Sequence, residues 1–217
     1  MPINRQKISQ MTPKGSELDP TDLMEVSVDT GSGYETRSIT GQQIISAGSY
    51  GLYTQTASST PVTNTTTETS LLDGGVGTLT VPANGFKVGD SFHAILTGYI
   101  SSVNNHTLTI IIKSGSVVLA TTGAVTMAGT TGRHWKLEVY FTVRTLGASG
   151  VASIATGGTF MYTKNASTNF EGTNFSTETI TGFDTTISNT LSITAKWGQT
   201  NAGDSIYSEI FTLNKTY

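Results

Sequence analysis

Residues 134–143 read HWKLEVYFTV, and this stretch decides the fold. Apolar and polar side chains alternate along it with a two-residue period, the apolar set being Leu137, Val139, Phe141 and Val143. Successive side chains of an extended chain point to opposite faces, so one face would be dry and the other wet. This pattern is typical of an antiparallel strand that covers a core on one side.

The pattern extends outward from this stretch to both sides. Residues 190–197 (TLSITAKW) repeat the alternation, with Leu191, Ile193, Ala195 and Trp197 on the apolar side. Six more short apolar runs lie between residues 77 and 213, separated by segments rich in Gly, Ser and Asn. Many short strands with turn signals between them predict an all-β protein, and we expect an antiparallel jelly-roll sandwich over residues 77–217.

Composition narrows the classes of function. Charged residues make up 12% of the chain, the net charge is −3, and there are 40 threonines and no cysteine. A weakly acidic surface lacks the basic field that attracts nucleic acid, and without cysteine neither disulfides nor thiolate metal sites can form. No apolar run reaches the length of a membrane span, and the first residues lack the apolar core of a signal peptide. We therefore expect a protein made in a cytoplasm, with no nucleic-acid partner and no membrane insertion.

Residues 1–45 differ in composition from the rest of the chain. Ten of the 27 charged residues lie between positions 3 and 45, and Asp29-Thr30-Gly31-Ser32-Gly33 joins two strand-like runs as a hairpin turn would. This short segment has few apolar side chains and can form only a marginal core. We therefore expect this module to fold against a partner. The residues expected to make that contact are Ile8, Met11, Leu23, Val26, Tyr34, Ile39 and Ile44.

Residues 46–76 separate the two regions. This segment is rich in Gly, Ser and Thr and shows no sustained hydrophobic period. Such composition is typical of an extended linker, which sets the expected organisation as module 1–45, linker 46–76 and sandwich 77–217.

Catalytic motifs are weak. Asp29-Thr30-Gly31-Ser32 resembles an aspartic protease loop, and Asp184-Thr185-Thr186 is a near-copy in which Thr186 replaces the glycine. The first copy is equally good hairpin chemistry. A glycosidase would need two carboxylates brought together by the fold, and no metal-ligand spacing joins the three histidines. We expect no catalytic residue, no cofactor and no metal, with an enzyme as the last alternative.

Aromatic residues near strand ends and loops suggest binding instead. The set is Tyr99, Trp135, Tyr162, Phe170, Phe175, Trp197 and Tyr207, and residues 164–184 form a long polar segment containing three phenylalanines. Aromatic rings beside Asn amides suit a glycan, and the residues expected to contact it are Trp135, Phe170, Phe175 and Trp197. The alternative is that these side chains fill the end of the sandwich.

Two stretches carry a resemblance to a known class of proteins. Residues 8–45 (ISQMTPKGSELDPTDLMEVSVDTGSGYETRSITGQQII) resemble the N-terminal module of bacteriophage appendage proteins. Residues 107–150 (TLTIIIKSGSVVLATTGAVTMAGTTGRHWKLEVYFTVRTLGASG) are similar to jelly-roll domains of phage head fibres and tail fibres.

The resemblance implies an oligomer, in particular a trimer, that attaches to capsid or tail proteins through its N-terminus. The expected function is thus a non-enzymatic head fibre or capsid-decoration protein on the virion surface, assembled in the host cytoplasm. The first alternative is a tail fibre or receptor-binding protein that recognises a host-surface glycan.

Overall fold

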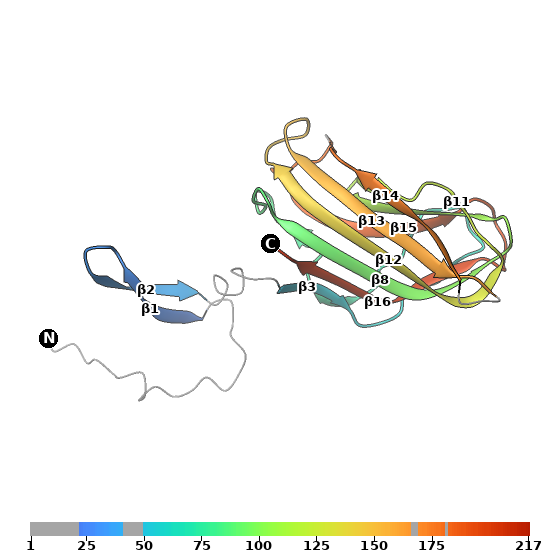
Figure 1. Ribbon diagram of the computed structural model, residues 1–217, viewed down its shortest axis with the longest axis horizontal. Helices are drawn as coiled ribbons and strands as arrows, with labels where there is room; N and C mark the ends of the chain where they lie inside the picture. Colours follow the sequence, from blue (N-terminus) through green and yellow to red (C-terminus); the bar gives the residue numbers. More distant parts are fainter. Residues whose placement is uncertain (1–21, 41–49, 166–168, 181) are drawn as a thin grey trace, which may run out of the picture. The chain divides into compact units, whose positions relative to one another are not determined.

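The computed structural model describes residues 22–40, 50–165, 169–180 and 182–217, with Tyr50 described by its backbone only. The chain divides into two compact units, residues 1–48 and residues 49–217. Within the described ranges the regular structure is entirely β, without a helix. The expected all-β class is therefore confirmed (Figure 1).

The described residues of the first unit, 22–40, form an antiparallel hairpin. Its strands are β1 (Leu23–Asp29) and β2 (Tyr34–Thr40). They pair without a bulge from Leu23 opposite Thr40 to Asp29 opposite Tyr34. The turn lies where the run of Gly, Ser and Asp predicted it.

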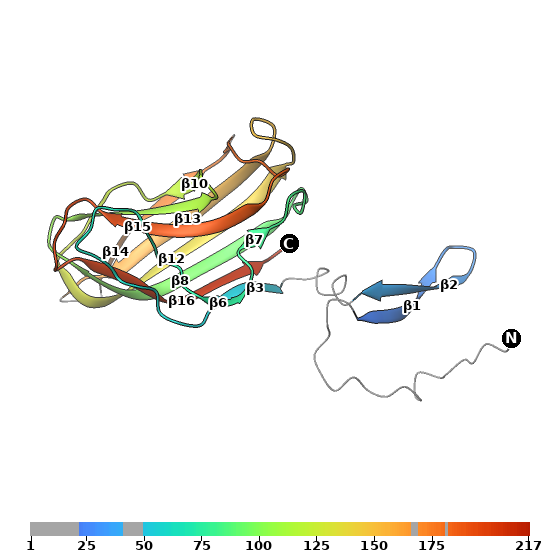
Figure 2. The same ribbon diagram turned by 180° about the vertical axis from the view of Figure 1, so that it is seen from behind.

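The second unit is a sandwich of two antiparallel sheets (Figures 1 and 2). The larger sheet runs in the order β14 (Phe170–Thr177), β13 (Ser153–Thr163), β12 (Thr130–Thr145), β8 (Ser91–Ser102), β16 (Ser205–Lys215), β3 (Tyr50–Gln55) and β6 (Gly75–Gly77), with β4 (Val62–Thr63) also paired to β16. The smaller sheet runs β10 (Val117–Thr121), β9 (Thr107–Ser114), β15 (Asn189–Trp197) and β5 (Thr69–Ser70), with β11 (Val125–Thr126) on β9 and β7 (Thr80–Val81) on β15.

Among the connections that join the two sheets, two are arranged as in a jelly roll. The chain crosses from β8 in the larger sheet to β9 in the smaller one, and returns from β15 to β16. Strand β8 pairs with β16 while β9 pairs with β15, so the two crossings run side by side. Strands β12, β13 and β14 then extend the larger sheet as a meander beyond β8. The expected antiparallel jelly-roll sandwich is confirmed at the level of fold class.

The core lies between the two sheets. Strand β8 alternates strictly between half-buried and buried positions over its 12 residues, as a strand with one face on the core should. The largest fully buried side chains come from both sheets and from one loop: Trp135, Trp197, Tyr162, Phe160, Phe211 and Phe183. Both tryptophans and most of the large aromatic side chains are therefore buried in the core.

The linker expected over residues 46–76 is wrong from Tyr50 onward. Strand β3 pairs with β16, Val62 and Leu71 are buried, and the Tyr53 hydroxyl donates to the carbonyl of Asp73 at 2.5 Å. The strands in this stretch are two to six residues long, too short for a visible period, and their Thr and Ser content imitates a linker. The sandwich therefore includes residues 50–76; residues 46–49 lie outside the described ranges.

Candidate functional site

The hairpin turn is built by its own side chains. Asp29 Oδ1 accepts a hydrogen bond from the Gly31 amide at 2.8 Å, and the Thr30 amide donates to the Gly33 carbonyl at 2.9 Å. Gly31 has φ +79°, a conformation that glycine adopts without steric cost. The Asp-Thr-Gly motif thus serves as turn chemistry in this structure.

Asp184, in the near-copy, is bound within its own loop as well. Its Oδ1 accepts hydrogen bonds from the Thr186 hydroxyl at 2.6 Å and the Thr186 amide at 2.8 Å. These bonds, led by the hydroxyl, hold the pKa of Asp184 below its ordinary value. Both aspartates of the protease-like motif therefore organise loops.

Four of the predicted attachment residues lie in the hairpin, on two different faces. Val26 is opposite Arg37 and Ile39 is opposite Met24, so Met24, Val26 and Ile39 share one face. Leu23 and Tyr34 lie on the other face and are 71% and 77% exposed. Ile8, Met11 and Ile44 lie outside the described residues. The hairpin therefore presents apolar side chains on both faces.

Two of the four predicted glycan contacts are wrong. Trp135 and Trp197 are 2% and 1% exposed and lie in the core. The Trp135 indole donates to the carbonyls of Tyr99 and Tyr207, and that of Trp197 to the carbonyl of Val62 at 2.9 Å. The two-residue period of the sequence already indicated that both tryptophans are buried, because each falls in step with the apolar side of its strand.

The two phenylalanines differ from each other. Phe175 is half-buried and packs on the core over Gly158, so it is not available as an open contact. Phe170, at the start of β14, is 70% exposed and remains accessible. Of the four expected contacts, only Phe170 projects from the surface.

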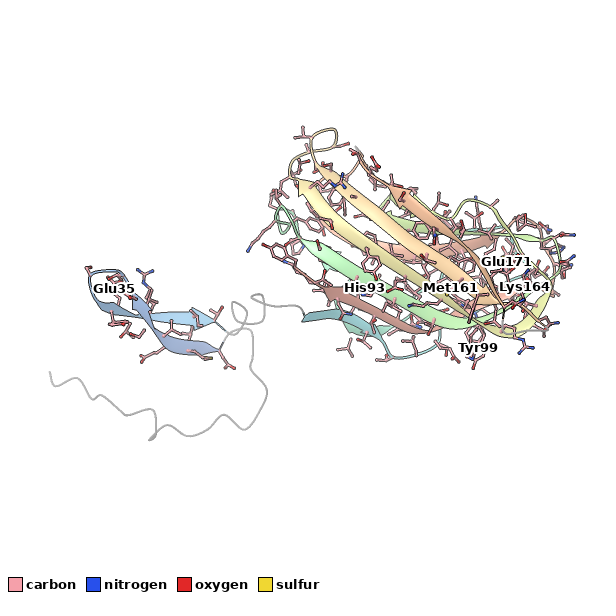
Figure 3. All side chains as sticks on the ribbon, viewed as in Figure 1. Glu35, His93, Tyr99, Met161, Lys164 and Glu171 are labelled. Carbon is pink, nitrogen blue, oxygen red and sulfur yellow. The ribbon has the colours of Figure 1, made fainter. Side chains whose placement is uncertain are left out.

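A row of aromatic side chains crosses the outer face of the larger sheet instead. Tyr99 on β8 pairs with His134 on β12 and with Tyr207 on β16. The ring centroid of Tyr99 is 4.3 Å from that of His134 and 5.9 Å from that of Tyr207. Figure 3 shows Tyr99 at the same end of the sandwich as Lys164 and Glu171, away from His93. We call Tyr99, His134 and Tyr207 the aromatic row.

A second cluster on this outer face is held by a carboxylate. Glu138 accepts from His93 Nε2 at 2.8 Å, from the Tyr140 hydroxyl at 2.7 Å and from Lys136 Nζ at 2.7 Å. The Lys136 bond first, and the Tyr140 bond next, lower the pKa of Glu138 to about 2. His93 also stacks on Tyr140 with ring centroids 4.4 Å apart. Glu138 is therefore ionised across the physiological range and has no proton to give as a general acid.

A buried acid joins two loops at the end where the aromatic row lies. Asp204 is fully buried, and its carboxylate accepts from the Val103 amide at 2.8 Å and faces His106 Nδ1 at 2.6 Å. Its backbone carbonyl accepts from the Thr63 hydroxyl at 2.6 Å. All these contacts are satisfied within the protein, which fits a structural clamp between the β8–β9 and β15–β16 connections.

A cavity of about 70 Å³ lies between the sheets. Its walls are almost entirely apolar, and its two inner polar residues, Ser114 and Asn189, bond to each other at 2.7 Å. The aromatic part of the lining comprises Phe86, Phe92, Phe141 and Phe183. Among the described residues that line it none is titratable, so these side chains offer no general acid or base.

Among the described residues, no three His, Cys, Asp or Glu side chains gather as a metal site would require. In the same ranges there is no helix with the length and hydropathy needed to cross a membrane. Comparisons with protein-family models, with curated proteins and with solved structures found no match to this chain.

Proposed function

We propose that this chain is a non-enzymatic structural protein of a bacteriophage virion, a short head fibre or capsid-decoration appendage. Its first unit binds capsid or tail proteins, and its sandwich is held at the virion surface. The resemblance of residues 8–45 and 107–150 to phage appendage proteins supports the virion as the site of assembly.

The observation that carries the proposal is the exposure of the hairpin. A two-stranded hairpin alone is marginally stable in water, because neither face is covered. Here Leu23, Met24 and Tyr34 are exposed, and Val26 and Ile39 are only half-buried. A partner that covers these side chains would supply the missing core, and chains that associate as a trimer could share it.

The sandwich fits the displayed part. Its outer surface is solvated mainly by Thr, Ser and Asn, and the ionic clusters seen in it are small and paired. Neutral hydroxyls keep a surface wet with little dependence on salt, which suits exposure outside a cell.

Virion incorporation tests the proposal. Phage whose full-length chain carries Val26→Asp with Ile39→Asp should lose the protein from purified particles, because two carboxylates would replace the apolar side chains that a partner would cover. Thr36→Asp adds a charge to the opposite face of the same hairpin and is the matched control. Immunoblots of purified particles, normalised to the capsid protein, give the readout. Normal incorporation of the double variant would contradict attachment through this face.

A further inference from the structure

We propose that the aromatic row of Tyr99, His134 and Tyr207 is a binding site for an uncharged glycan chain. This inference goes beyond the structural role proposed above, and only the position of the row relative to the particle rests on that proposal. It replaces the buried tryptophans with a site at which His134 is exposed and the two tyrosines are half-buried.

The row is a continuous surface rather than a chance exposure. It crosses three neighbouring strands, β12, β8 and β16, which form the centre of the larger sheet. All three side chains point away from the core, because their strand neighbours Trp135, Ile100 and Ile206 are buried. A site on paired central strands is rigid and is held in place without a loop.

The chemistry of the rings matches a sugar. Tyr combines an apolar ring with a polar hydroxyl, and imidazole offers a nitrogen on each side of the ring. Sugar rings likewise combine C–H faces with hydroxyl edges. Ser101 and Ser205, which pair on the next outward position, add hydroxyl groups at the border of the row.

The charges around the row favour a neutral ligand. Lys136 is the next outward residue after His134 on β12, and its ammonium group is paired with Glu138 at 2.7 Å. Arg133, beside His134 in the sequence, donates from its guanidinium to the carbonyl of Asn165. Neither charge is turned toward the row, so an acidic polysaccharide would find no partner there.

The position within the sandwich favours a ligand outside the particle. Lys215 pairs with Tyr50, where the described part of the second unit begins, and Tyr207 lies eight residues earlier on the same strand. With the usual rise per residue, the row is roughly 27 Å from that point of entry. If the chain is anchored through its first unit, the entry end is tethered and the row lies at the other end.

Phe170 extends the same line. Tyr162 on β13 pairs with Trp135 on β12. The next residue on β13, Thr163, points outward and pairs with Phe170 on β14. Phe170 is therefore two strands beyond His134, about 10 Å across the sheet. An extended chain of several sugar units could contact the aromatic row and Phe170 together, which a single sugar could not.

The test uses the full-length protein and an array of neutral oligosaccharides with three to six hexose or N-acetylhexosamine units. The strongest glycan on the array is then titrated by calorimetry. Tyr99→Ala and Tyr207→Ala should each raise Kd by about tenfold or more, because each removes a ring from the row. Tyr140→Ala removes a ring that is 52% exposed, at the other end of the same face, and should leave Kd unchanged.

Three outcomes would overturn the inference. These are no neutral glycan bound by the wild-type protein, binding only of acidic glycans, or equal weakening by Tyr140→Ala. Sedimentation of the same variants covers a fourth outcome: if Tyr207→Ala dissociates an oligomer, the row is an interface between copies of the chain. All of these variants keep the hairpin intact, so a failure here would leave virion incorporation, and the structural proposal, unaffected.

Discussion

Glu138 owes its low pKa to donors that converge on it from two strands. Lys136 and Tyr140 come from β12, the strand of Glu138 itself, and His93 comes from β8. Hydrogen bonds to the charged form favour ionisation, and they outweigh the modest desolvation that opposes it. The folded state therefore binds a proton at this site less readily than the unfolded chain does.

This difference sets a pH dependence of stability. The pKa falls from 4.5 to about 2 on folding, so the stabilisation is fully present above pH 4.5 and is lost as the pH falls toward 2. We expect Glu138→Gln to lose stability relative to wild type at pH 6, and the difference in the free energy of unfolding to shrink steadily toward pH 2. Urea unfolding at a series of pH values measures it.

Tyr140→Phe is the control, because it removes one donor and keeps the carboxylate. The Glu138 pKa should then rise partway toward 4.5 in a carbon-detected NMR titration. An unchanged titration in this variant would show that the tyrosine hydroxyl is not among the groups that hold the charge.

At the scale of the element, glycines inside strands allow close packing at the centre of the larger sheet. A Cβ at Gly98 on β8 would come within 2.0 Å of the Tyr207 carbonyl oxygen and 2.8 Å of the Ser208 Cα, both on β16. Trp135 is the cross-strand partner of Gly98 on the other side. The absence of a side chain therefore lets β16 and Trp135 approach β8.

We expect Gly98→Ala to lower the free energy of unfolding by about 1–3 kcal/mol, since backbone atoms must move to admit the methyl group. Gly157→Ala on β13 is the matched control, because its Cβ would meet nothing closer than the Phe175 carbonyl oxygen at 3.9 Å. That variant should stay within about 0.5 kcal/mol of wild type. Urea unfolding compares the two, and equal effects would remove the close approach as the cause.

The length of a strand decides whether it could be predicted from the sequence. Long strands such as β8 and β12 were predictable, because alternation over ten or more residues records which face meets the core. Strands β4 and β5, of two residues each, were not, because their pairing is decided by partners more than a hundred residues away. The aromatic row has the same origin: only the register of β12, β8 and β16 brings Tyr99, His134 and Tyr207 together.

At the scale of the whole molecule, the two units differ in what holds them together. Every buried apolar residue of the described chain lies between Tyr53 and Leu213, within the second unit. The hairpin of the first unit contributes none, and its stability rests on pairing of two seven-residue strands. A sandwich with its own continuous core needs no help from such a hairpin.

A chain that begins at Ser49 should therefore unfold at the same urea concentration as the full chain, and in one cooperative transition. Both tryptophans of the protein lie in the sandwich core, so their fluorescence reports on this unit alone. Amide exchange of the full-length protein should meanwhile be fast in β1 and β2 and slow in β8, because free hairpins open readily and central strands do not. A truncated chain with a clearly lower midpoint would show that the first unit stabilises the sandwich, and its role could not then be attachment alone.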